Sequence, residues 1–145
     1  MCSYCGCEAE PVVKALMDDH VEIVALMSEI LDAVEEGSSE RAAKMTTRLA
    51  ELFGRHAETE EAGLFHQLVL AGEATEEIDR LLEDHRRLRS GLSDPAVTLQ
   101  TDHLRQLFVE LRHHAEIEET DLFPFALQVM PPQSWSIIRQ VACRN

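Results

Sequence analysis

Hydrophobic positions recur three and four residues apart over long stretches of the chain, which is the spacing of the buried side of an amphipathic helix. Four such stretches begin near residues 11, 38, 75 and 104, and a short fifth one covers residues 135–141. Glycine, serine and proline mark the boundaries between them, as is typical of helix ends and turns. These boundaries are Glu36-Gly37, Ala71-Gly72, Ser93-Asp94-Pro95 and Pro131-Pro132.

Four long helices joined by short loops predict an antiparallel up-down four-helix bundle, to which the last stretch adds a short C-terminal fifth helix. Alternating β-branched runs that would build a sheet are scarce, so the predicted fold class is all-α. We assign residues 11–145 to this bundle and residues 1–10 to a cysteine-rich N-terminal segment. Pro124 is expected to kink or end the last turn of the fourth helix, because proline donates no backbone hydrogen bond.

The chain is strongly acidic, with a formal net charge of −14 over its 145 residues. Nucleic acids and anionic membranes would repel it, so we expect neither as a partner. No apolar run approaches the roughly 20 residues that cross a bilayer, and the N-terminus does not read as a basic and then apolar signal peptide. We therefore expect a cytoplasmic protein.

Six ionisable residues interrupt the otherwise hydrophobic sides of the long helices. The frame H-A-E-x-E-E-x-x-L-F begins at His56 and again 58 residues later (114 − 56) at His114. In each copy a glutamate follows the histidine by four residues, so the two side chains lie one turn apart on one helix face. Each copy is preceded by another histidine, which ends the tripeptide D-D-H or E-D-H. The six candidate metal ligands are His20, His56, Glu60, His85, His114 and Glu118.

With helix directions alternating, these residues should meet at one level, roughly 15 Å from the same end of the bundle at a rise of about 1.5 Å per residue. Two carboxylates in an apolar core are costly unless they are paired or bind metal, and no lysine or arginine lies on these helix sides. We therefore predict two metal ions bridged by the two glutamates, one held by His20 and His56 and the other by His85 and His114. Mixed imidazole and carboxylate ligands favour iron, with manganese or zinc as alternatives.

The metal prediction depends on the repeat, because a single His-x-x-x-Glu pair on a helix usually forms only a surface hydrogen bond. Three further histidines, His66, His103 and His113, lie off the pattern or near helix ends, and we expect them to be solvated or to support the ligands. Glu61 and Glu119 follow the ligand glutamates by one residue and should point about 100° away, in solvent or behind the ligands.

The two frames, each preceded by His20 or His85 and closed by Leu-Phe, resemble the hemerythrin-like family, also called the HHE cation-binding domain. The resemblance extends from Ala9 to about Val141. It implies a four-helix bundle that holds two iron ions in a non-haem centre with an oxo or hydroxo bridge. It also implies a small-molecule ligand, since members bind or react with dioxygen, nitric oxide or hydrogen peroxide, or sense oxygen or iron.

The ligand set of this chain differs in two features from that of the oxygen-carrying members of the family it resembles. Those members have a fifth histidine one turn from the one that matches His85, where this chain has Leu81 and Arg89. Their last carboxylate is an aspartate five residues after its histidine, whereas Glu118 follows by four. The centre implied here is more symmetric and poorer in nitrogen ligands, with open positions on both metals. This favours redox chemistry with peroxide or nitric oxide over reversible oxygen carriage.

The cysteines are concentrated at the chain ends, at Cys2, Cys5, Cys7 and Cys143. The predicted bundle brings both ends toward the metal level, so the four thiols could form an additional zinc or iron site. A redox thiol that serves the metal centre is a second interpretation. A disordered tail is a third, because the first residues of a domain are often disordered.

Three functions fit these observations. The first is a di-iron oxidoreductase that consumes hydrogen peroxide or nitric oxide, like a peroxidase or catalase, in oxidative or nitrosative stress defence. No side chain beyond the metal ligands stands out as a general acid or base. The second is a sensor or binding protein for oxygen, nitric oxide or iron that signals through the cysteine-rich segment. The third is a helical bundle with a structural zinc pair.

Overall fold

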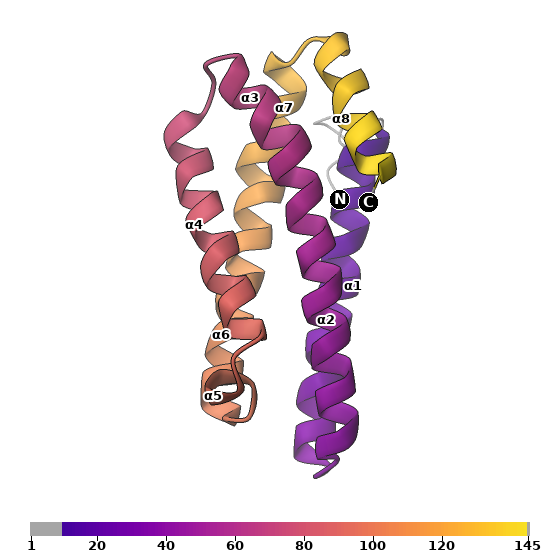
Figure 1. Cartoon of the computed structure of the whole chain (residues 1–145), viewed down its shortest axis with the longest axis vertical. Coiled ribbons are helices and arrows are strands. Elements are labelled where there is room, and N and C mark those ends of the chain that lie inside the picture. Colours follow the sequence, from indigo (N-terminus) through magenta and orange to yellow (C-terminus); the bar gives the residue numbers. More distant parts are fainter. Residues whose placement is uncertain (1–9, 145) are drawn as a thin grey trace.

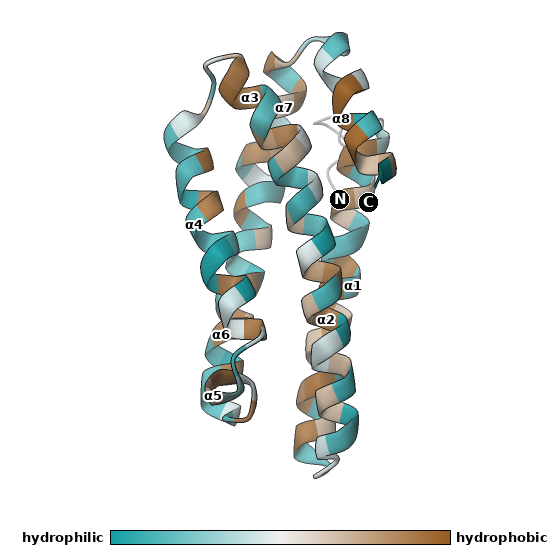
Figure 2. Ribbon diagram, in the orientation of Figure 1, coloured by the Kyte–Doolittle hydropathy of each residue, from teal (hydrophilic) through white to brown (hydrophobic). Residues whose placement is uncertain are grey.

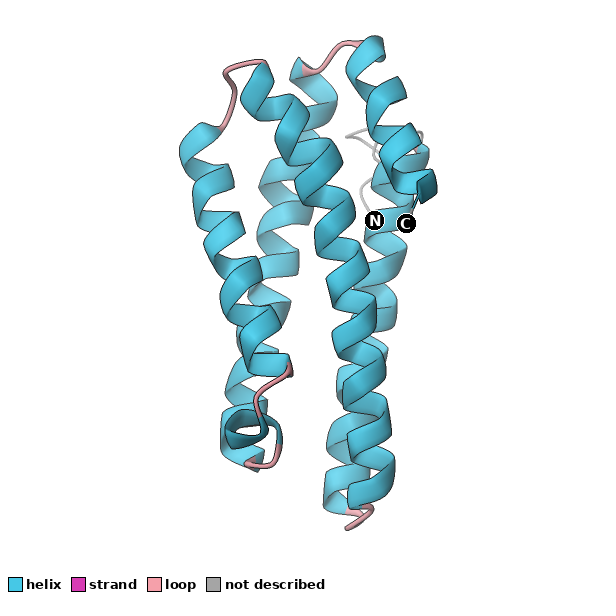
Figure 3. Ribbon diagram, viewed as in Figure 1, coloured by secondary structure: helices cyan, strands magenta, loops and turns pink. Residues whose placement is uncertain are grey.

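The computed structural model describes residues 10–144, and these form helices joined by loops, with no strand among them (Figure 3). Two of the long helical rods contain a segment of wider π-helix, named η2 and η3. The elements are α1 (Pro11–Glu35), α2 (Ser39–Thr59), η2 (Glu60–Phe65), α3 (His66–Leu70), α4 (Thr75–Leu92), α5 (Pro95–Thr98), α6 (Thr101–Ile117), η3 (Glu118–Leu122), α7 (Phe123–Val129) and α8 (Pro132–Arg144).

Four rods form the predicted antiparallel up-down bundle (Figure 1). The rods are α1, the continuous α2-η2-α3, α4, and the continuous α6-η3-α7, with α1 packed against α2 and α4 packed against α6. The short α8 turns back and packs against η2 and α1, at the end of the bundle where α1 begins (Figure 1). The predicted all-α fold, including the C-terminal fifth helix, is confirmed. In the part of the chain that the structure describes, no helix has the length and hydrophobicity to span a membrane.

Glycine ends the first two rods in the same way. Gly37 and Gly72 adopt left-handed φ angles of 74° and 73°, which cost glycine little because it has no Cβ atom. The amide that follows each glycine then donates to a carbonyl five residues back, from Ser38 to Ala33 and from Glu73 to Leu68, both at 2.9 Å. These bonds satisfy carbonyl groups that the end of a helix would otherwise leave unpaired. The turns at Gly37 and Gly72 thus reverse the chain as predicted.

Two local expectations need adjustment. Pro124 does not end the fourth rod: it lies in the first turn of α7, which continues to Val129. The preceding η3 segment accommodates this, because a turn with a π-helix register no longer places the missing amide of Pro124 in an α-helical ladder. The break after α4 also contains a short helix, α5, which Asp94 caps by accepting a 2.9 Å hydrogen bond from the Ala96 amide.

The hydrophobic core is divided into two parts by a polar layer. On α1, Met17 belongs to the part under α8 and Ile23 to the part at the far end, with buried His20 between them. On α4, His85 likewise separates Leu81 from Leu88. Hydrophilic residues cover much of the outward-facing sides of α2 and α4 (Figure 2), so these interior polar residues are the exceptions to the pattern.

Candidate metal centre

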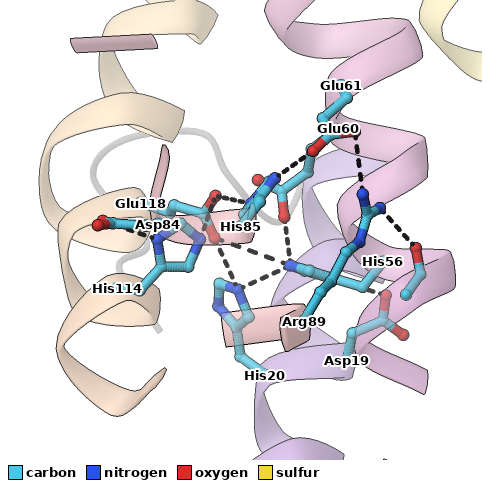
Figure 4. Close-up of polar contacts among 11 residues, drawn as sticks. Asp19, His20, His56, Glu60, Glu61, Asp84, His85, Arg89, His114 and Glu118 are labelled. Atoms are coloured by element: carbon cyan, nitrogen blue, oxygen red, sulfur yellow. Dashed lines mark hydrogen bonds and ion pairs between the residues drawn. The ribbon is translucent and has the colours of Figure 1, made fainter. Parts of the chain in front are cut away.

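The six predicted ligands meet in this polar layer (Figure 4). Each of the four long rods contributes, and all six side chains are buried, with exposed fractions between 0% and 5%. Their nitrogen and oxygen atoms form two groups within each of which all ligand atoms lie within 4.8 Å of one another. The first group comprises His20, His56, Glu60 and Glu118, and the second comprises His85, His114 and Glu118.

Glu118 is the residue that both groups share. Its Oε1 lies 3.0 Å from His20 Nε2 and 3.7 Å from His56 Nε2. Its Oε2 lies 3.3 Å from His114 Nε2 and 3.8 Å from His85 Nε2. One carboxylate therefore directs one oxygen to each pair of imidazoles, which is the arrangement of a bridging ligand.

Glu60 takes a less symmetric position than the sequence suggested. Its carboxylate contacts Nε2 of His56, and of the four histidines it is grouped only with His20 and His56. Several buried polar atoms in this layer have no hydrogen-bond partner within residues 10–144. They include Oε2 of Glu60, the Nε2 atoms of His85 and His114, and Oε2 of Glu118. Buried polar atoms without partners are rare in folded proteins, because each costs the hydration it has lost. A cation among them would remove that cost.

Each histidine directs its second ring nitrogen outward, toward a carboxylate on a neighbouring rod, and Figure 4 draws the pairs of His56, His85 and His114. The pairs are Asp19 with His56, Glu61 with His85, Asp84 with His114 and Glu119 with His20, at Nδ1–oxygen distances of 2.9, 2.9, 3.3 and 3.8 Å. The pairs follow one another from rod to rod and close a ring around the bundle. In the first three pairs the carboxylate keeps the proton on Nδ1 and leaves Nε2 free to bind a metal. Glu119 lies beyond hydrogen-bond distance of His20, whose Nδ1 has no hydrogen-bond partner within residues 10–144.

The four outer carboxylates were only partly foreseen. Glu61 and Glu119 were expected in solvent or behind the ligands, and they lie behind His85 and His20. The roles of Asp19 and Asp84 were missed. The available signal was the acidic residue that directly precedes His20 and His85, in D-D-H and E-D-H, but each aspartate supports a histidine on another rod rather than its neighbour.

The repeated Leu-Phe pair has a role in packing the imidazoles. Phe65 stacks on His85 with ring centroids 5.4 Å apart and an interplanar angle of 17°. Phe123, its counterpart in the second copy, stacks on His20 at 5.9 Å and 14°. Each copy of the frame thus orients a histidine of the other half, and the aromatic rings restrict the imidazole rotamers.

A π-helical segment begins at the candidate glutamate in each copy of the frame, at Glu60 in η2 and at Glu118 in η3. Such segments are rare and occur frequently at functional sites. The wider turn sets the directions of two consecutive acidic side chains, so that Glu60 points inward while Glu61 reaches His85. The α-helical spacing used for the sequence did not include this change of register.

Without metal, the buried charges are balanced by protons. Burial alone would lower the pKa of His20, but the hydrogen bond to Glu118 and the nearby Glu119 carboxylate outweigh it and raise the value from 6.5 to about 9. Burial also opposes protonation of His56, yet the charge of Glu60 and the hydrogen bond to Asp19 hold its pKa well above 6.5. The pocket therefore stabilises positive charge on its imidazoles.

The pocket shifts the pKa values of the two glutamates in opposite directions. Burial and the charge of Glu118 raise the pKa of Glu60. Burial would also raise the pKa of Glu118, but a hydrogen bond from Glu60 and the charge of His114 reverse this and hold it well below its usual range. Glu118 is thus the ionised carboxylate of the metal-free pocket, and a metal cation would replace the protons that neutralise it.

These observations fit a metal site. Four imidazoles present Nε2 atoms to one buried volume, a shared carboxylate joins two groups of donors, and several donor atoms there have no other partner within residues 10–144. A family model described as the hemerythrin HHE cation-binding domain matches residues 12–126, which is most of the chain.

The chain belongs to the hemerythrin HHE family.

Membership of this hemerythrin HHE family establishes cation binding as the role of the domain, and the buried His and Glu cluster is where the cation fits. No individual curated protein and no solved structure matches the chain significantly.

The positions that depart from oxygen-carrying relatives provide no additional ligand. Leu81 is 4% exposed and belongs to the hydrophobic core. Arg89 points away from the six ligands, donating to the Gly54 carbonyl at 3.2 Å and approaching Glu61 at 3.5 Å. The off-pattern histidines, His66, His103 and His113, are all exposed.

The predicted thiol cluster falls largely outside the described residues, since Cys2, Cys5 and Cys7 lie before residue 10. Cys143 is exposed in the last turn of α8.

Proposed function

We propose that this protein binds two iron ions and is an oxidoreductase that consumes hydrogen peroxide or nitric oxide. The ligands in this proposal are His20, His56, Glu60, His85, His114 and Glu118, with Glu118 as the bridge. The observation that carries it is the shared Glu118 carboxylate, which directs one oxygen to each pair of imidazoles. Bound iron would supply a redox-active Lewis acid with room for a small ligand.

The small number of donors in the second group supports reaction rather than storage. His85 and His114 have one carboxylate between them and no further histidine at positions 81 or 89. A groove of about 880 Å³ between α4 and the α6-η3-α7 rod is lined by Leu81, Phe125 and Asp84. Asp84 also contacts His114, so this groove leads to the back of the candidate ligands and is a route for small molecules.

Within this proposal the side chains of the pocket have separate tasks. The outer carboxylates hold the imidazoles in the tautomer that presents Nε2. Phe65 and Phe123 exclude water beside His85 and His20. In a catalase-like reaction one peroxide is reduced to two waters while a second is oxidised to dioxygen, so electrons and protons balance without an external reductant. A peroxidase-like reaction would take its two electrons from a donor such as nitric oxide or a thiol.

The test is turnover by purified protein loaded with two irons per chain. We expect many equivalents of peroxide to be consumed, with oxygen release measured at an electrode and nitric oxide consumption measured separately. His114→Ala should abolish turnover, and the matched control His103→Ala, which alters an exposed histidine that does not line this groove, should keep it.

Reaction of only one equivalent would contradict an enzyme and support the alternative, a sensor or binding protein for oxygen, nitric oxide or iron. A colourless protein that retains zinc under iron-replete expression would support the structural zinc pair.

We keep as a further proposal that Cys2, Cys5, Cys7 and Cys143 form an additional zinc or iron site or a redox thiol group. Support comes from Arg139 of α8, which donates to both carboxylate oxygens of Glu10 at 3.1 and 2.7 Å and so holds the start of α1 beside the helix of Cys143. A metal analysis that finds no third ion, together with unchanged thiol reactivity on oxidation of the iron, would exclude both roles.

A further inference from the structure

The two halves of the candidate centre have similar ligands but different charges behind them. In the His85 half, Glu61 contacts His85 Nδ1 through Oε1 at 2.9 Å. Its other oxygen, Oε2, lies 3.5 Å from Nη1 of Arg89. The carboxylate behind His85 is thus shared between an imidazole and a guanidinium, and Arg89 is fixed further by its 3.2 Å hydrogen bond to the Gly54 carbonyl.

The same arrangement supports the other histidine of that half. Asp84 contacts His114 Nδ1 through Oδ2 at 3.3 Å, and its Oδ1 accepts a 3.1 Å hydrogen bond from Nη2 of Arg87. Arg87 also approaches Glu110 of α6 at 3.3 Å. Both arginines lie on α4, two residues apart, and each compensates the carboxylate behind one of the two histidines.

The His20–His56 half has no such compensation. Asp19 and Glu119 contact His56 and His20, and neither forms an ion pair with a lysine or arginine anywhere in residues 10–144. Residues 1–9 contain no lysine or arginine that could supply one. The negative charge of both outer carboxylates is therefore directed undiminished at this half.

We propose that Arg87 and Arg89 are positioning residues that make the two halves electrostatically unequal, so that the His20–His56 half takes up its metal ion first. This inference rests on the proposed two-metal site. A guanidinium bonded to an outer carboxylate withdraws charge from the imidazole that the carboxylate supports, and so weakens that imidazole as a ligand. Its own positive charge also opposes a nearby cation.

The expected effect is moderate, since the side chains of Arg87 and Arg89 are 53% and 39% exposed and water screens their charges. A Coulomb interaction through an effective dielectric between that of protein and that of water gives about a tenfold change in the affinity for a divalent ion. The change should be largest at low ionic strength and should shrink as salt is added.

The affinities of the two binding steps can be measured by titrating the metal-free protein with cobalt(II) under anaerobic conditions, followed by absorption spectroscopy and calorimetry. We expect two separated binding steps, and crystals grown with one equivalent should show anomalous scattering between His20 and His56. Arg87→Gln combined with Arg89→Gln should strengthen the second step about tenfold and narrow the gap between the steps. The first group also has one more carboxylate, but the arginine variants leave that difference unchanged and isolate the contribution of the guanidinium groups.

The matched control is Arg86→Gln with Arg105→Gln, which removes the same charge. Arg86 pairs with Glu83 and Arg105 with Glu35, and neither glutamate contacts a candidate ligand, so the difference between the two binding steps should not change. Asp19→Asn combined with Glu119→Gln neutralises the carboxylates behind the other two histidines. It should weaken binding of the first ion and so reduce the difference in affinity between the two steps.

Each result decides between distinct conclusions. If the arginine variant leaves the gap unchanged or widens it, or if the first ion lies between His85 and His114, the inference is wrong and the two-metal proposal stands. Uptake of fewer than two cobalt ions by the unaltered protein would overturn the two-metal proposal itself, and the inference with it.

Discussion

The two copies of the H-A-E-x-E-E-x-x-L-F frame fold alike and are covered differently. In the first copy, Gly63 is buried under α8, and a Cβ atom at this position would lie 3.3 Å from Ile138 Cγ2. The corresponding residue of the second copy is Asp121, which is exposed and lines the groove beside α4. The repeat thus supplies the same inner chemistry twice, while its surroundings close one copy and leave the other open.

The ligand glutamates differ in the same sense. Glu118, in the exposed copy, faces all four histidines, whereas Glu60, in the covered copy, belongs only to the group of His20 and His56. An internal repeat therefore does not require equal halves. One copy supplies the residue that joins the two metal positions, and the other supplies a ligand for one of them.

Replacing the shared glutamate, Glu118, should have the largest effect on metal binding. We expect Glu118→Gln to lose both metal ions, because both groups use this carboxylate. The fall in metal affinity should exceed the roughly 10–100-fold that follows the loss of a supporting partner. Glu60→Gln should weaken the first group alone and leave a protein with one ion. Metal analysis of proteins loaded under the same conditions measures both outcomes.

The two variants change the same chemical group, so they are matched controls for each other. Their unfolding by urea in metal-free form would reveal any loss of structure that is independent of metal. Equal losses of metal in both variants would contradict the division of the site into a shared and an unshared glutamate.

Exchanging Gly63 and Asp121, the residues that differ between the covered and the exposed copy of the frame, should have the next largest effect, which falls on the free energy of unfolding. Gly63→Asp places a charge against Ile138 of α8 in a buried position, and we expect it to lower the free energy of unfolding by about 4 kcal/mol. Asp121→Gly, the reverse exchange at an exposed position, should cost only about 0.3 kcal/mol, because aspartate and glycine are both poor helix formers. Urea unfolding monitored by circular dichroism measures both changes.

A similar cost for both exchanges would mean that α8 does not close the first copy in solution. Gly63→Ala separates packing from charge, because it adds only the Cβ atom and the neighbouring Ile138 side chain would have to move slightly.

The bundle and the inner side chains could be predicted because both leave periodic marks in the sequence. Helix positions follow from hydrophobic spacing, and His20 or His85 stands out because a polar residue interrupts that spacing. The frame repeated after 58 residues then indicates that Glu60 and Glu118 have equivalent places on two rods. The fold that results also agrees with the family match over residues 12–126.

The outer carboxylates could not be predicted in the same way, because they depend on contacts between rods. Asp19 lies beside His20 in the chain but supports His56. Such a pairing depends on the relative rotation and height of two helices, to within about one hydrogen-bond length. The π-helical register at Glu60 and Glu118 adds a rotation that ideal helix geometry omits. The same change of register explains why Pro124 does not end the fourth rod, since η3 lets the helix continue past it.

A pH titration of the metal-free protein should give the smallest of the three effects and would locate the charge in the His20–His56 half. The pKa of His20 is raised from 6.5 to about 9, so its protonation stabilises the fold. That stabilisation is fully present below pH 6.5 and is lost as the pH rises through about 9.

We expect the metal-free protein to lose about 3 kcal/mol of unfolding free energy between pH 6.5 and 9.5, and His20→Gln to remove most of this dependence. The raised pKa of Glu60 acts in the same direction, since its proton is also lost as the pH rises. Metal binding should reverse the slope, because a cation needs the deprotonated imidazoles that destabilise the empty pocket. Thermal unfolding at several pH values, with and without two equivalents of iron(II), would show whether the slopes are opposite. Parallel slopes would mean that the metal does not displace these protons, and that the ions bind somewhere other than the polar layer.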